Sequence, residues 1–245
     1  MGIPQKQIQS QLSPMLREFI KAEDELINQD GLMECCREAF DAKELDLFSA
    51  VCHLMDHQLY TFVKWARTLP LYKDLKTEDQ IVLMQRRGLH LMSLTVCYYF
   101  INDENLISLP NGQKVVISNI KDENVADIVQ GLVDTAGRLR HLNLDKHELV
   151  CLKGIMLLNP VSKGLIDVKR VQEMQETMED LLIDYVDSQP HIDEKVTGEL
   201  LLRLSEIERL CQLTREEVIM RKSQGRLGRY PLLMELFEDK PSWLY

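Results

Sequence analysis

The sequence predicts a mostly helical protein in which layers of helices surround one central helix, with a single short β-hairpin. Apolar residues recur at helical spacing through almost the whole chain. One stretch, residues 89–101, is apolar on nearly every side, so the helix that contains it should be enclosed by other helices. An enclosed helix implies layers rather than a simple bundle.

The helices before and within this central stretch are marked by their apolar faces. Residues 11–28 and 44–69 each read as one amphipathic helix. A third helical block covers residues 75–101, with Thr77 as a candidate N-cap and Gln80 at capping-box spacing. The broad face of the second helix carries Leu47, Val51, Leu54, Met55, Leu59, Phe62, Trp65 and Ala66.

One stretch, "NLISLPNGQKVVIS" at 105–118, breaks the helical pattern. Its apolar residues alternate on either side of Pro110-Asn111-Gly112, which predicts a short hairpin. The alternating residues are Ile107, Leu109, Val115 and Ile117. Helical spacing then resumes at about 122–142, 145–158, 165–188 and 193–222. No repeat or linker is visible, so residues 1–245 are expected to form one domain.

Composition narrows the class of partner. The net charge is −10, from 39 acidic and 29 basic residues, which argues against nucleic acid or an anionic membrane as the main partner of this chain. None of the six cysteines forms a C-x-x-C pair, so reduced intracellular thiols are expected and a zinc site is not. The N-terminus is polar, and no apolar run approaches the roughly 18 residues that a membrane span needs.

No motif of a catalytic site is found. The phosphate-binding loops, the zinc-protease motif and the serine-hydrolase elbow are all missing from the sequence. His53 and His57 are four residues apart, as a metal pair would be, but no third ligand is evident. We therefore expect no enzyme activity, no metal and no cofactor.

The C-terminal stretch "GRYPLLMELFEDKP" (228–241) predicts a short helix with one apolar stripe. Pro231 suits a first helical turn, and Gly225 and Gly228 loosen the preceding segment. A helix this short is unstable alone, so it must dock on the core and can undock from it. The stripe is formed by Leu232, Leu233, Leu236 and Phe237.

Four stretches, in order, resemble the ligand-binding domains of nuclear receptors: residues 57–85, 144–165, 199–210 and 231–237. The motifs are most similar to the retinoid X receptor and fushi tarazu factor 1 branches. The resemblance implies a three-layer antiparallel helical sandwich with an internal ligand pocket, and residues 231–239 as the terminal activation helix. It also implies a DNA-binding zinc module elsewhere in the full protein and a transcription factor that acts in the nucleus.

In this family the docked terminal helix completes a groove for coactivator helices with leucines at i, i+3 and i+4 (LxxLL). A cation and an anion at the two ends of such a groove would match the dipole of the bound helix. Arg67 and Glu235 match the family's charge clamp. The expected groove residues are Val63, Leu83, Met84, Leu232 and Leu236.

The resemblance also places a ligand pocket, and here the sequence departs from the family. The arginine that binds acidic ligands is replaced by Tyr99, and the family's usual tryptophan falls on Gly88. Because a buried carboxylate without a partner is unfavourable, we expect a neutral lipid or sterol, with Tyr99 or Gln58 as hydrogen-bond donor. The expected pocket residues are Leu54, Met55, Gln58, Leu89, Met92, Val96, Tyr99, Thr214 and Glu217.

Two alternatives remain open at this point. Leu54 and Met55 are larger than the alanines of retinoid X receptors, so they could fill the pocket and leave the terminal helix docked without a ligand. A helical lipid carrier would share the cavity but would not need Arg67 and Glu235.

The tenth helix of the family is a dimer surface, and its counterpart here has more apolar width than one core face requires. The sequence therefore allows a homodimer or a heterodimer with a retinoid X receptor, and complete burial within the monomer is the alternative. The residues concerned are Leu200, Leu201, Leu204 and Ile207.

Overall fold

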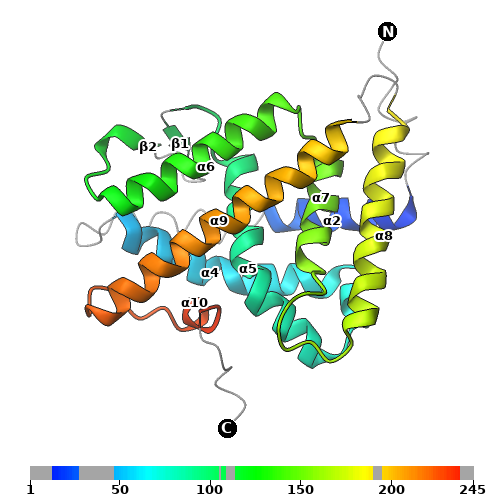
Figure 1. The fold of residues 1–245 in the computed structure, drawn as a ribbon. Coiled ribbons are helices and arrows are strands. Elements are labelled where there is room, and N and C mark those ends of the chain that lie inside the picture. Colours follow the sequence, from blue (N-terminus) through cyan, green and yellow to red (C-terminus); the bar gives the residue numbers. More distant parts are fainter. Residues whose placement is uncertain (1–12, 28–46, 105, 109–113, 190–194, 238–245) are drawn as a thin grey trace.

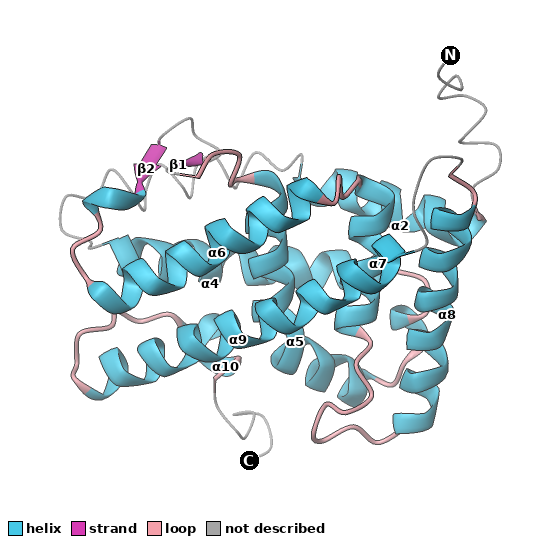
Figure 2. Ribbon diagram, turned by 45° about the horizontal axis from the view of Figure 1, so that its top comes forward, coloured by secondary structure: helices cyan, strands magenta, loops and turns pink. Residues whose placement is uncertain are grey.

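The computed structural model describes residues 13–27, 47–104, 106–108, 114–189 and 195–237. Helices dominate these residues, and a single pair of strands accompanies them (Figures 1 and 2). The elements are α2 (Pro14–Ile27), α4 (Leu47–Thr68), the 3-10 turn η1 (Tyr72–Asp74), α5 (Thr77–Tyr99), β1 (Leu106–Ser108), β2 (Lys114–Val116), the 3-10 turn η2 (Ile117–Asn119), α6 (Glu123–His141), α7 (Lys146–Leu157), α8 (Val168–Asp187), α9 (Lys195–Ser223) and α10 (Pro231–Glu235).

The helices pack in three layers, as predicted. Helices α2 and α4 contact each other in one layer, α5 contacts α7 and α7 contacts α8 in the middle layer, and α6 contacts α9 in the third. Helix α5 contacts α4, α6, α7 and α9, so it is enclosed on most sides. Its half-buried residues Ser93 and Val96 line a cavity.

The hairpin is confirmed for strands β1 and β2, whereas the expected strand residue Ile117 instead begins the 3-10 turn η2. Strands β1 and β2 are antiparallel, with Ile107 paired to Val115. The expected turn at Pro110-Asn111-Gly112 lies outside the described residues.

The expected cap of α5 is wrong in detail. The N-cap position falls on Lys76, and Thr77 is already the first helical residue. The side-chain amide of Gln80 donates instead to the carbonyl oxygens of Tyr72 (2.9 Å) and Leu75 (3.1 Å) in the preceding turn. This glutamine therefore holds η1 against the start of α5 rather than closing a capping box.

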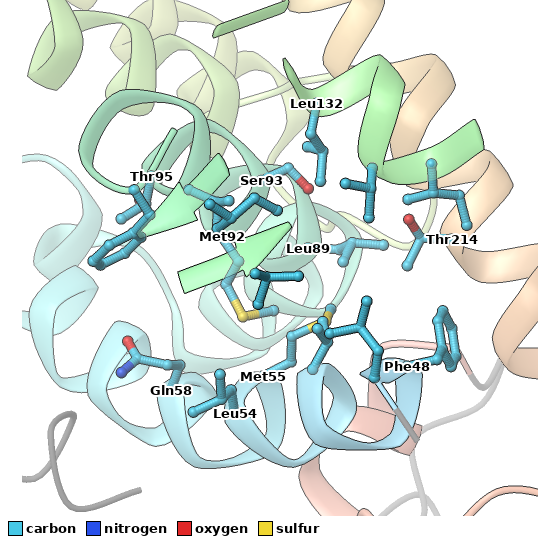
Figure 3. Close-up of a pocket in the computed structure, with 18 of the residues that line it drawn as sticks. Phe48, Leu54, Met55, Gln58, Leu89, Met92, Ser93, Thr95, Leu132 and Thr214 are labelled. Atoms are coloured by element: carbon cyan, nitrogen blue, oxygen red, sulfur yellow. The ribbon is translucent and has the colours of Figure 1, made fainter. Parts of the chain in front are cut away.

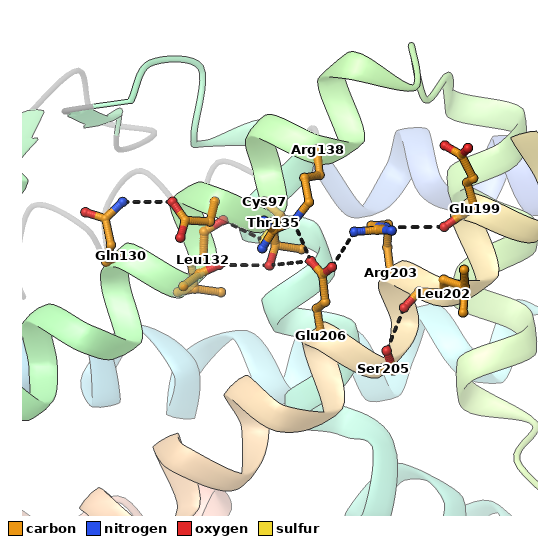
Figure 4. A network of polar contacts seen from close by, with 12 residues as sticks. Cys97, Gln130, Leu132, Thr135, Arg138, Glu199, Leu202, Arg203, Ser205 and Glu206 are labelled. Carbon is orange, nitrogen blue, oxygen red and sulfur yellow. Dashed lines mark hydrogen bonds and ion pairs between the residues drawn. The ribbon is translucent and has the colours of Figure 1, made fainter.

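Polar contacts fix α9 against α6 (Figure 4). The Glu206 carboxylate accepts from Arg138 Nε at 2.9 Å and from the Thr135 hydroxyl at 3.4 Å. Arg203, one turn earlier on α9, pairs with the same carboxylate. These charged hydrogen bonds fix how α6 and α9 are aligned along each other in the third layer.

A buried ion pair joins the first layer to the middle one. Lys153 of α7 donates to Glu23 of α2 at 2.6 Å, and neither side chain has exposed surface. The Lys153 ammonium also lies 5.4 Å from the centre of the Trp65 ring on α4. Burial lowers the pKa of Lys153, and the Glu23 carboxylate opposes that shift.

Truncating one member of this pair should therefore destabilise the fold strongly. Lys153→Met leaves the Glu23 carboxylate buried without its partner, and we expect a loss of about 3–5 kcal/mol in the free energy of unfolding. The measurement is urea denaturation followed by circular dichroism. The double variant Glu23→Leu/Lys153→Met removes both charges and should recover most of the loss. A double variant as unstable as the single one would contradict this account.

Candidate functional site

The terminal helix α10 is docked against α4. Leu233 has no exposed surface, and Leu236 is 3% exposed. Burying two leucines contributes about 2 kcal/mol each, which is what a five-residue helix needs to hold its position. Gly88 on α5 makes room for this packing, because a Cβ atom there would lie 3.3 Å from both Leu236 and Leu59. A tryptophan at this position, as in the family pattern, would displace Leu236.

Three polar anchors add to this packing. The Asp56 carboxylate on α4 accepts from the backbone N–H of Leu233 at 2.7 Å. The Tyr230 hydroxyl donates to the carbonyl oxygen of Ser49 at 2.9 Å. Arg215 on α9 donates to the carbonyl oxygen of Leu236 at 3.0 Å, and its guanidinium lies 5.3 Å from the Phe237 ring centre. The polar anchors come from α4 and α9, and the packing at Gly88 comes from α5. All three helices therefore help to hold α10.

The two clamp residues lie on the expected elements. Arg67 is exposed in the last turn of α4, and Glu235 is half-buried at the end of α10. The two residues therefore put a guanidinium and a carboxylate of opposite charge on two helices that pack against each other.

The expected groove residues divide into two groups. Val63 is half-buried and Leu232 is 37% exposed, so both can touch a partner. Leu83, Met84 and Leu236 have exposed fractions of 0%, 6% and 3%, so they belong to the core and would support the floor of a groove rather than its rim. On α5 the half-buried neighbours Ile81, Val82 and Gln85 keep exposed surface instead.

Sequence reasoning missed Tyr60. Its side chain is 58% exposed, and the Lys64 ammonium lies 4.7 Å from the ring centre. Tyr60, Val63 and Arg67 are spaced i, i+3 and i+7, so they lie on one face of α4. That spacing was visible in the sequence and would have added an aromatic residue to the candidate surface.

An apolar cavity of about 170 Å³ lies between α4, α5, α6, α9 and the hairpin (Figure 3). Seven of the nine expected pocket residues line it: Leu54, Met55, Gln58, Leu89, Met92, Val96 and Thr214. Sequence reasoning missed the walls from α6 and the strands, including Ile107, Val115 and Leu132. Among the residues that the structure describes, no residue of α10 and no charged side chain lines the cavity.

The other two assignments to the pocket are wrong. Tyr99 does not line the cavity. It lies instead beside Glu23, and burial and this carboxylate raise the pKa of its hydroxyl. Glu217 is 4% exposed and accepts hydrogen bonds from Asn124 at 3.0 Å and from Arg221. Both side chains are engaged in structural contacts of neighbouring helices.

A second, more open cavity of about 540 Å³ adjoins the first. The two share the walls Leu47, Phe48, Val115 and Val125. Its charged lining is mainly basic and consists of Lys114, Lys121, Arg221, Arg226 and Asp122. Arg221 is paired with Asp122 and Glu217, so the exposed cations of this opening are Lys114, Lys121 and Arg226.

The expected dimer residues on α9 also divide. Leu200 and Ile207 have no exposed surface and form the part of this apolar width that packs in the monomer core. Leu201 is 36% exposed, and Leu202, which sequence reasoning missed, is 61% exposed. Leu204 is half-buried, so the apolar surface that α9 offers consists of Leu201 and Leu202 with part of Leu204.

The pair His53 and His57 does not form part of a larger ligand group. Among the described residues no three histidine, cysteine or acidic side chains are placed to hold a metal ion. His53 packs edge-on against Tyr230, with ring centres 6.4 Å apart, so it supports the anchor of α10. Within the same residues, no helix combines the length and the apolar character that a bilayer span requires.

Layered helices, an apolar cavity beneath α4 and a docked terminal helix define a receptor ligand-binding domain. The family described as the ligand-binding domain of nuclear hormone receptors matches residues 41–223, and the chain belongs to this family. Its homologues are transcription factors. Members of the family are generally not enzymes.

The chain is similar in sequence to several members of this family. It is 29% identical to nuclear hormone receptor FTZ-F1 of Bombyx mori over 94% of the chain and 43% of that protein. It is 31% identical to nuclear receptor subfamily 5 group A member 2 of Mus musculus over 81% of the chain and 36% of that protein. It is 29% identical to retinoic acid receptor RXR of Biomphalaria glabrata over 79% of the chain and 45% of that protein. The chain thus spans less than half the length of these relatives.

A solved structure has the same fold. The ligand-binding domain of Fushi tarazu factor 1 of Drosophila melanogaster superimposes with a TM-score of 0.78. The match has 25% sequence identity and covers 94% of this chain and 96% of the other.

The Asp56 anchor gives a first test of how α10 is held. Asp56→Ala removes the acceptor of the Leu233 N–H, and we expect about 1 kcal/mol less stabilisation of the docked helix. The exposed Arg226 and Arg229 just before α10 should then be cut by trypsin about fivefold faster. Asp134→Ala, which removes an acidic side chain on α6, is the matched control and should leave the rate unchanged. Equal rates in both variants would mean that Asp56 does not hold α10.

Proposed function

We propose that this chain recruits coactivators through LxxLL helices that bind beside the docked α10. The observation that carries this proposal is that Arg67 lies at the end of α4 and Glu235 at the end of α10, the helix that packs on α4. The partly exposed Tyr60, Val63 and Leu232 supply apolar contacts between the two charges. An amphipathic helix with leucines on one face fits such a surface, and its dipole orients it with its C-terminal end toward Arg67.

We infer further that α10 docks without depending on a ligand. Its anchors Asp56, Ser49 and Arg215 are groups of the protein itself. Since no α10 residue lines the apolar cavity, a ligand there would act on α10 only through α4 or α9. The cavity of about 170 Å³ is also smaller than the roughly 300–1,000 Å³ of ordinary ligand sites. This size favours a receptor whose pocket is filled largely by its own side chains.

A second candidate is a ligand-controlled receptor, and the basic opening is the observation that favours it. A lipid with a short apolar part would fit the inner cavity and leave an acidic group near Lys114, Lys121 and Arg226. A neutral lipid or sterol would have Gln58 as donor, since Gln58 lines the cavity and Tyr99 does not. Native mass spectrometry followed by organic extraction separates the two candidates by detecting or failing to detect a bound lipid.

The relatives are longer than this chain. From them we propose further partners for the whole protein to which the chain belongs. The retinoid X receptor relative and the exposed Leu201 and Leu202 support a homodimer or a heterodimer with a retinoid X receptor. DNA binding would belong to a separate zinc module, and the site of action would be the nucleus.

The clamp is tested by peptide binding. Arg67→Ala and Glu235→Ala each remove one charge that faces an end of the bound helix, and we expect each to weaken an LxxLL peptide about tenfold. Fluorescence anisotropy with a labelled peptide measures the affinity. Lys169→Ala, an exposed cation on α8, is the control and should change little. An unchanged affinity for the LxxLL peptide in both clamp variants would contradict the proposal.

Ligand independence is tested by filling the cavity. Val96→Phe places a larger side chain at a wall of the cavity, so a ligand would be excluded while the anchors of α10 stay intact. We expect the affinity for the LxxLL peptide to stay within about twofold. Thermal unfolding checks that the variant is folded. A folded variant that has lost peptide binding would favour the ligand-controlled candidate.

A further inference from the structure

The segment from Asn159 to Val168 presents three apolar side chains to solvent. Val161 is 80% exposed, Ile166 is 61% exposed and Val168 is 45% exposed. Single exposed apolar residues are ordinary on protein surfaces, but a concentration within one short segment marks an interaction site. We call this segment, between α7 and the start of α8, the 159–168 loop.

The 159–168 loop is braced rather than free. Asp79, a fully buried residue in the first turn of α5, accepts from the backbone N–H of Ile166 at 2.6 Å and of Asp167 at 3.1 Å. The Asn159 side chain accepts from the Val161 N–H at 3.0 Å. The apolar side chains therefore extend from a fixed backbone, and a partner that covers them loses little free energy in ordering the loop.

The loop is continuous with the Arg67 end of the proposed coactivator surface. Gly164, with φ of 108°, approaches α5 so closely that a Cβ atom there would lie 3.6 Å from Val82. Figure 1 shows the loop passing beside the first turns of α5. The start of α5 is in turn tied to η1, which follows Arg67, because the Tyr72 hydroxyl donates to the Gln80 carbonyl oxygen at 2.6 Å.

Exposed cations follow this path from Arg67 to the loop, although the whole chain carries a net charge of −10. Exposed Lys73 and Lys76 lie between Arg67 and α5, and exposed Lys163 lies on the loop. None of these three lysines forms an ion pair with a described residue. The exposed acidic residues along the same path are Asp74, Glu78 and Asp167.

We propose that the 159–168 loop is a second contact for the coactivator, binding an acidic and apolar segment that follows the LxxLL helix toward its C-terminus. This proposal rests on the proposed coactivator function, which sets the direction of the bound helix. The chain leaving the helix at Arg67 meets Lys73 and Lys76 first, and then Val161 and Ile166. About eight extended residues reach about 26 Å, which is enough to cross the start of α5.

The experiment compares two labelled peptides by fluorescence anisotropy. The short peptide contains only the LxxLL helix, and the long one adds eight residues with two leucines and three glutamates at the C-terminal end. We expect the long peptide to bind the unaltered chain about tenfold more tightly. Val161→Ser/Ile166→Ser should abolish this advantage and leave the affinity of the short peptide unchanged. Ile183→Ser on α8 is the control, because Ile183 is an exposed apolar residue, 45% exposed, that lies outside the 159–168 loop and outside the proposed dimer and coactivator surfaces.

Each other outcome overturns the proposal in a distinguishable way. If the short peptide binds but the extension adds nothing, or its advantage survives in the double variant, the second contact is wrong and the coactivator function stands. If the short peptide does not bind at all, both proposals fall. If the double variant changes only the oligomeric state in sedimentation velocity, the loop is covered by a second copy of the chain and not by the coactivator.

Discussion

Helix α5 carries apolar side chains around most of its circumference, and the other helices are arranged to remove that surface from water. Four helices contact it, which is why the fold has layers. The same arrangement positions the site. The first turns of α5 hydrogen-bond to η1 and to the 159–168 loop. Further along the helix, Gly88 packs against Leu236, and the last turns line the apolar cavity. Coactivator surface and cavity therefore share one rigid element.

The terminal helix shows how a marginal element acquires a defined position. Five residues cannot form a stable helix alone, so the docked state depends on groups outside it. Asp56 satisfies a backbone donor at the start of the helix, Arg215 satisfies an acceptor at its end, and two buried leucines supply apolar contact. Because these contacts are distributed over three helices, small shifts of any of them can change the population of the docked state.

The cavity and the coactivator surface lie on different sides of α4. Met55 and Gln58 line the cavity, whereas Tyr60, Val63 and Arg67 lie on the outward face. A ligand would therefore have to act on the coactivator surface through α4 or through α9. A cavity of about 170 Å³ gives such a ligand few contacts with which to favour one state, whereas the protein anchors of α10 act at all times.

The helical class, the hairpin and the stripe of the terminal helix could be predicted from the sequence alone, because each depends on local periodicity and polarity. Seven of the nine expected cavity residues were also correct, and these came from the resemblance to the receptor family. The sequence could not decide which of two neighbouring apolar residues faces the core. Leu83 and Met84 are buried while Ile81 and Gln85 keep exposed surface, and Leu202 is exposed while Leu200 is not. That choice depends on the rotation of each helix against its neighbours. Tertiary contacts also decided the roles of Asp56, Gly88 and Asp79, because their partners lie far away in the sequence.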